Sequence, residues 1–134
     1  MASQLKVDTI TGVTTAGSIV VTGEGNSTTT NLQQGLAKAW SHYNTITNTA
    51  QDTLNISGIT DNGTGDHSFS VSNAFSNANY VVVAFGQEET GGGARIISGK
   101  GTPTSSQRQV DVNTITGSAR DLLSHNLTFH GDLA

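Results

Sequence analysis

One segment specifies the fold most clearly: residues 54–72, with the sequence LNISGITDNGTGDHSFSVS. Apolar and polar residues alternate from Leu54 to Ser57 and again from His67 to Ser72, which is the period of a half-buried strand. Residues 61–65, between these runs, are mostly Asp, Asn and Gly, which favour tight turns and tolerate a positive φ. The segment therefore predicts a β-hairpin.

Strand-like runs continue through the C-terminal half of the chain. Further strands are predicted over residues 79–87, 95–98, 108–115 and 123–129. The run 79–87 is almost continuously apolar, which predicts a strand covered on both faces, with Phe85 buried beside Phe69, Phe75 and Phe129. A turn at Thr90–Gly93 is expected to return the chain into the next strand.

The last two runs alternate more strictly. Val110 and Val112 are separated by polar residues, and one face of the final run carries Leu123, His125, Leu127 and Phe129. Helix is expected to be scarce, with residues 118–123 forming a turn at most. Short strands separated by turn residues predict an all-β protein: an antiparallel β-sandwich or jelly-roll-like domain with an extended N-terminal β arm.

Residues 31–43 fit two structures. Leu32, Leu36 and Trp40 recur every four residues behind a candidate N-cap at Asn31, which favours a helix. Gly35 interrupts that pattern, and a strand from Leu36 to Tyr43 is equally allowed. We favour the strand.

The N-terminal segment differs from the remainder. Two brief β-like runs, around residues 5–10 and 18–22, are separated by Gly and Thr and carry too few apolar groups to fold alone. We therefore predict an arm over residues 1–34 that lies on a partner, and a β-sandwich over 35–134. The predicted interface residues are Leu5, Val7, Ile10, Ile19, Val21 and Trp40.

Composition narrows the function. Thr, Gly, Ser and Asn make up 61 of 134 residues, 34% are hydrophobic, and there is no Cys. A net charge of −4 argues against nucleic-acid binding, and the 12% of charged residues is too low for a helical bundle. Such a thin core favours oligomerisation. No signal peptide or spanning segment is apparent, so we expect a soluble protein without membrane insertion, made in a cytoplasm.

No chemistry-bearing cluster emerges. The four histidines are scattered, so no metal site is predicted and surface or rim positions are expected for them. Asp61–Asp66 lacks the repeat of a calcium loop, and Gly99-Lys100 fails the spacing of a phosphate loop. Glu88 and Glu89 are expected at a solvated strand end. We predict no catalytic residue, no cofactor and no enzymatic activity, and Trp40 is an interface or core anchor rather than a ligand platform.

Several sequence blocks occur together in one protein family. They are residues 5–10 (LKVDTI), 35–40 (GLAKAW), 58–66 (GITDNGTGD) and 77–80 (NANY). Over residues 4–85 the chain resembles the small, tail-fibre-like virion structural proteins of tailed bacteriophages, especially marine and cyanobacterial ones. The resemblance implies a multi-copy, homotrimeric particle component, whose N-terminal arm attaches to the virion or joins the subunits.

These expectations lead to one primary hypothesis and three alternatives. The primary hypothesis is a non-enzymatic tail-fibre or appendage protein, located in the virion, whose partners are its own copies and other virion proteins. A capsid-decoration (cement) protein on the head is the first alternative. A carbohydrate-binding module that contacts a host surface glycan is the second, and a polysaccharide hydrolase is the third.

Overall fold

The computed structural model describes residues 4–12, 19–22, 29–88 and 93–134. The chain divides into two compact units, Met1–Leu36 and Ala37–Ala134. Each unit is described by itself.

The first unit contains a small antiparallel sheet. Its strands are β1 (Val20–Thr22) and β2 (Thr29–Asn31), and a single helical turn, α1 (Leu32–Gly35), follows. The amide of Leu32 donates to the carbonyl of Ile19 at 2.9 Å, which ties this turn to the sheet. Residues 4–12 form no strand, so the predicted β run over 5–10 is wrong for the single chain, in which no described segment pairs with it.

The ambiguous segment 31–43 contains both predicted structures in sequence. One helical turn ends at Gly35, and the strand begins three residues later than predicted, at Ala39. Glycine disfavours the interior of a helix, so the helical pattern that begins at Leu32 ends at Gly35.

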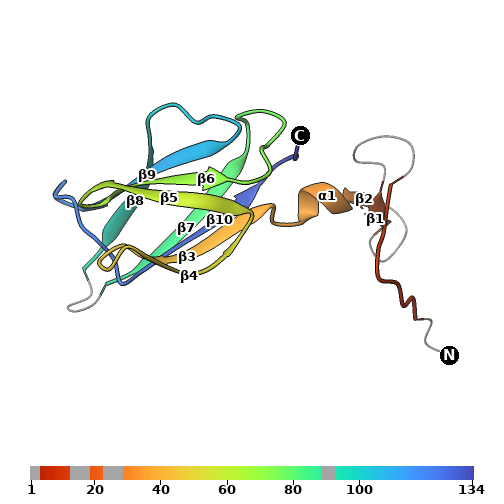
Figure 1. Cartoon of the computed structure of the whole chain (residues 1–134), viewed down its shortest axis with the longest axis horizontal. Helices are drawn as coiled ribbons and strands as arrows, with labels where there is room; N and C mark the ends of the chain where they lie inside the picture. Colours follow the sequence, from red (N-terminus) through yellow and green to blue (C-terminus); the bar gives the residue numbers. More distant parts are fainter. Residues whose placement is uncertain (1–3, 13–18, 23–28, 89–92) are drawn as a thin grey trace. The chain divides into compact units, whose positions relative to one another are not determined.

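The second unit is an antiparallel β-sandwich, as predicted (Figure 1). One sheet has the order β4-β3-β10-β7 and contains β3 (Ala39–Asn44), β4 (Thr49–Leu54), β7 (Val81–Gln87) and β10 (Ser124–His130). The other has the order β5-β6-β9-β8 and contains β5 (Ile56–Gly63), β6 (Asp66–Val71), β8 (Arg95–Lys100) and β9 (Gln107–Thr114).

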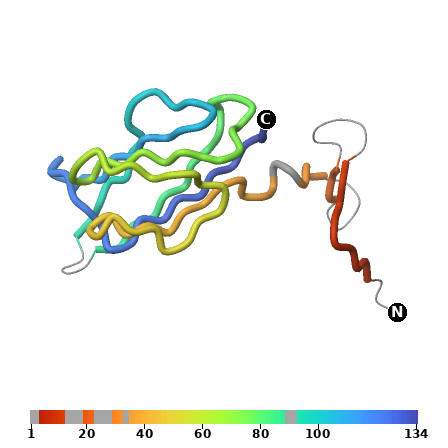
Figure 2. Tube along the Cα trace, viewed as in Figure 1, coloured from red at the N-terminus to blue at the C-terminus, as the bar shows by residue number. Residues whose placement is uncertain are grey.

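The chain passes repeatedly between the two sheets, as the Cα trace in Figure 2 shows. Hairpins join β3 to β4 and β5 to β6, and the chain then enters β7 in the first sheet. It crosses to β8 and β9 in the second sheet and returns as β10 between β3 and β7. The predicted return at 95–98 is therefore a crossover between sheets, because β8 pairs with β9. The predicted turn Thr90–Gly93 lies largely outside the described residues.

The inner faces of the two sheets form the core. Its buried apolar residues are Ala39, Tyr43, Phe69, Val71, Phe75, Val110, Val112, Leu122, Leu127 and Phe129. The alternation in β6, β9 and β10 thus predicted the inner faces correctly. Leu123 is an exception, since it precedes β10 and is exposed, whereas its neighbour Leu122 is buried.

Two predictions about β7 are wrong. The strand lies at a sheet edge, and only one of its faces is covered. Val81, Val83 and Phe85 point outward and are more than 60% exposed, whereas Val82 and Ala84 pack against the core. The apolar run therefore reflects an uncovered outer face rather than a strand buried on both sides.

Gly65 closes the predicted β5–β6 hairpin under tight constraints. Its φ is +72°, and a Cβ atom there would lie 2.5 Å from the carbonyl oxygen of Val112. Its amide donates to the Asp121 carboxylate at 2.8 Å, and its carbonyl accepts from the Val112 amide at 2.7 Å. Only glycine satisfies both the backbone conformation and this close approach.

Asn55 joins the two sheets where β4 passes into β5. It has a positive φ of 55°, and its side-chain amide donates to the carbonyls of Lys38 and Asn73, each at 3.1 Å. Its side-chain oxygen accepts from the Asn73 amide at 2.7 Å. Asn tolerates this conformation better than most residues, and its side chain replaces backbone partners at the corner.

Candidate functional site

One candidate interaction surface is the outer face of the β4-β3-β10-β7 sheet. Cross-strand partners share a face, so the register defines its members. One row runs Leu54, Trp40, Thr128, Val83, and the next runs Asp52, His42, Asn126, Phe85. Val81 and His130 extend it along β7 and β10. We call these ten residues the outer face.

Apolar side chains lie at both edges of the outer face. Val83 and Phe85 on β7 are 62% and 68% exposed, and Leu54 on β4 is 46% exposed. Polar side chains on β10 separate them, and Trp40 is half-buried between Leu54 and Thr128. A contiguous apolar patch typically marks a binding surface, and here the polar side chains of β10 divide the apolar residues into one group on β7 and another around Leu54.

The predicted interface residues belong to both units. Leu5, Val7, Ile10 and Val21 are exposed in the first unit, Leu5 by 83%, and Ile19 is half-buried there. Trp40 lies on the outer face of the sandwich. The exposure of these residues fits an interface, but the interface itself stays a prediction. Trp40 and the N-terminal residues belong to different units.

Two histidines contradict the expectation of surface or rim positions. His67 on β6 and His125 on β10 are fully buried, and their ring centroids are 6.5 Å apart across the core. No ring nitrogen of either residue has a hydrogen-bond partner in the described part of the chain. The sequence signal was present, because each histidine alternates in phase with core residues of its strand.

Burial determines the protonation of this histidine pair. Desolvation, together with a smaller contribution from the neighbouring His67, lowers the pKa of His125 to about 4. Desolvation also lowers the pKa of His67, although the carboxylates of Asp61, Asp121 and Asp66 partly oppose this effect. Both rings are therefore neutral at pH 7.

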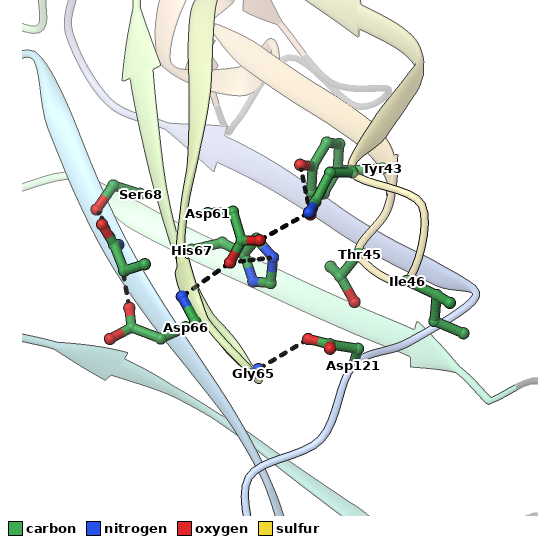
Figure 3. A network of polar contacts seen from close by, with 12 residues as sticks. Tyr43, Thr45, Ile46, Asp61, Gly65, Asp66, His67, Ser68 and Asp121 are labelled. Carbon is green, nitrogen blue, oxygen red and sulfur yellow. Dashed lines mark hydrogen bonds and ion pairs between the residues drawn. The ribbon is translucent and has the colours of Figure 1, made fainter.

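A polar network lies beside His67 (Figure 3). The Asp61 carboxylate lies 3.8 Å from Nε2 of His67 and accepts hydrogen bonds from the Gly63 amide and the Asn48 side chain. These hydrogen bonds hold the pKa of Asp61 below its usual range, and the one from Gly63 contributes most. The network joins the β3–β4 turn to the β5–β6 hairpin.

The Asp61–His67 pair does not form a recognisable catalytic site. His67 is fully buried, so it cannot meet a substrate without movement of the sheets. The carboxylates of Asp61, Asp66 and Asp121 each accept hydrogen bonds from protein donors, which fits a hairpin turn rather than a calcium loop. The described residues contain no group of three side chains arranged to hold a metal ion.

Two residues considered in the sequence analysis, Lys100 and Glu88, form ion pairs. Gly99 and Lys100 lie in strand β8 and do not form a phosphate-binding loop. Nζ of Lys100 lies 2.6 Å from a carboxylate oxygen of Asp66 and 3.6 Å from one of Asp111. Burial raises the pKa of Asp66, but hydrogen bonds from Lys100, Gln109 and Asn62 outweigh this and leave it lowered.

Glu88 also differs from the expectation. Its carboxylate pairs with Arg95 and its side chain is only 15% exposed, so it is not a solvated strand end. The pair lines an open hollow between β7 and β8, together with Phe85, Gly86 and Ile97. Glu89 lies outside the described residues.

Comparison with known proteins assigns no family. No family model, no curated protein and no solved structure matches this chain. Among the described helices, none is long and apolar enough to cross a membrane.

Proposed function

We propose that this chain is a non-enzymatic structural component of a tailed-bacteriophage virion, a multi-copy, homotrimeric tail-fibre or appendage protein. The proposal rests on the resemblance of residues 4–85 to such proteins and on the exposed apolar residues of the N-terminal unit. Its partners are its own copies and neighbouring virion proteins.

The exposure of the N-terminal residues carries most of the argument. Leu5, Val7 and Ile10 are 83%, 54% and 58% exposed, and they precede a sheet whose two strands have three residues each. Burying one such side chain is worth about 1.5–3 kcal/mol, and a two-stranded sheet of this size is marginal in water. A partner subunit that covers these residues would supply the missing stabilisation.

Truncation tests this role of the arm. Deleting residues 1–30 removes β1 and the exposed residues before it, while every core residue of the sandwich lies beyond residue 36. We expect the truncated chain to keep its β-sheet circular dichroism but to be absent from purified particles. As a matched control, Ile115→Ser removes an exposed apolar residue of the sandwich and should leave incorporation unchanged. Normal incorporation of the truncated chain would contradict the proposal.

Copy number separates the tail from the head. An appendage protein is present in a small number of copies at one vertex, whereas a decoration protein covers the capsid. Labelling purified particles with antibody and viewing them by electron microscopy distinguishes these locations directly.

A carbohydrate-binding role is the second candidate, and the outer face supplies the observation that favours it. Trp40 lies in the row beside the one that holds Asp52, His42 and Asn126. An aromatic ring beside carboxylate and amide groups is an arrangement suited to a sugar ring. A glycan array probed with the wild type and with Trp40→Ala tests it; binding that depends on Trp40 supports the role, and no binding by the wild type counts against it.

A further inference from the structure

Strand β7 offers an open edge for pairing. It pairs with β10 over seven consecutive residue pairs without a register shift. In the described part of the chain, no backbone hydrogen bond joins its other edge to another segment. From Val81 to Gln87 it contains no charged residue and no proline. A flat, neutral edge strand of this kind is a template for another strand.

The other three sheet edges carry features that oppose such pairing. β4 carries Asp52, and its pairing with β3 shifts register once. β5 carries Asp61 and shifts register twice against β6. β8 begins and ends with a positive charge, at Arg95 and Lys100. Charges and bulges are the usual protection of sheet edges, and β7 alone among the four strands lacks them.

We propose that β7 of a second copy of this chain pairs antiparallel with β7, about a two-fold axis at Ala84. This register overlaps all seven residues of the strand and sets Val83 opposite Phe85 of the second copy. Each such pair joins an aromatic and a β-branched side chain on the outer face, which is a favourable cross-strand combination. The same strand meets itself, as an isologous contact requires.

The charges near β7 are compatible with this contact. The chain has a net charge of −4, so two copies repel each other, and a contact between them must keep negative charges apart. The carboxylate of Glu88, directly after the strand, is paired with Arg95 of the same chain. Toward the core, Ala84 lies at the axis and packs against the core, and Gly86 lies against Leu122 of the same chain. The contact uses none of the predicted arm residues. Because it has two-fold symmetry, it cannot lie within the proposed homotrimer and would join one trimer to another.

A charged substitution on β7 tests the contact by mass. Val83→Lys places a charge on a 62% exposed side chain, and Ile96→Lys makes the same change on a 50% exposed side chain of β8. Sedimentation equilibrium is run on the full chain at up to about 1 mM, where a contact of about 4 kcal/mol is half-formed. A half-formed contact raises the weight-average mass to about 1.5 times that of the dissociated form. We therefore expect Val83→Lys to lower the wild-type mass by about a third and Ile96→Lys to leave it unchanged. Equal masses for all three proteins, or equal losses in both variants, would overturn the proposal.

Disulfide trapping tests the register, because the chain has no cysteine of its own. In the proposed pairing, residue 83 lies opposite residue 85 of the second copy, while residues 83 of both copies are diagonal, about 7–8 Å apart. Disulfides need Cα atoms within about 7 Å. Oxidising a mixture of Val83→Cys and Phe85→Cys should therefore give more covalent dimer than oxidising either variant alone. If the mixture gives no excess, the proposed register is wrong.

Discussion

Acid should destabilise the sandwich through the buried histidine pair, and His125 is the residue to measure. In the folded state its pKa falls from 6.5 to about 4, because burial disfavours the charged ring. The unfolded chain therefore binds a proton at a higher pH than the folded chain does. This contribution to stability is fully present above pH 6.5 and is lost as the pH falls towards 4.

The expected loss follows from the size of the pKa shift. A shift of this size corresponds to about 3 kcal/mol in the free energy of unfolding between pH 7.5 and pH 4. His67 adds to the loss in the same direction, because desolvation lowers its pKa too. Since small domains have only about 5–15 kcal/mol of stability in total, the effect should be plain in a titration.

Urea denaturation at several pH values, followed by the fluorescence of the single Trp40, measures this effect. His125→Phe should lose about 3 kcal/mol less than the wild type between pH 7.5 and pH 4. His125→Leu is a second apolar variant in case the larger ring packs poorly. His42→Asn, on the exposed outer face, serves as the control and should behave as the wild type. A wild-type stability that stays constant over this range, or an equal loss in His125→Phe, would refute the reasoning.

Two structural predictions concern the turns that close the sandwich. Gly65→Ala should lower the free energy of unfolding by roughly 1–3 kcal/mol from its positive φ alone, and by more because of the close backbone of Val112. Gly117→Ala is the control, because Gly117 has a φ of +88° but an added Cβ there would meet open space, so only the backbone strain changes. An equal loss in the free energy of unfolding in the two variants would show that the close approach of Val112 is unimportant. Asn55→Ala removes three hydrogen bonds and should cost about 2–4 kcal/mol in urea denaturation. Asn55→Gly keeps the backbone conformation accessible, so a wild-type stability for this variant would mean that the side chain does not hold the corner.

Local signals in the sequence predicted much of the fold. The β5–β6 hairpin follows from a Gly- and Asn-rich turn and from the alternation of β6, which are properties of adjacent residues. The alternation from Leu54 to Ser57 instead crosses the corner at Asn55, where β4 ends in one sheet and β5 begins in the other. The pattern also placed Val110 and Phe129 on inner faces correctly. The position of a strand within its sheet is different, because it depends on partners far along the chain. The apolar run at 79–87 therefore suggested a strand covered on both faces, although β7 is an edge strand with one face uncovered.

The candidate sites were harder to predict for the same reason. His67 and His125 lie 58 positions apart in the sequence, and only the packing of two sheets brings their rings to 6.5 Å. Their phase with Phe69 and Leu127 indicated inner faces, but their polarity argued for the rim. The outer face likewise depends on the order of four strands in the sheet, and no local sequence pattern specifies that order.

Quantitative mass spectrometry of purified particles tests whether this chain is a structural part of a virion. Peptides of residues 37–134, measured against a labelled standard of the full chain, give the number of copies per particle. We expect several copies per particle, in a multiple of three, that remain after the particles are purified through a density gradient. A chain that is abundant in infected cells but absent from the purified particles would contradict this expectation.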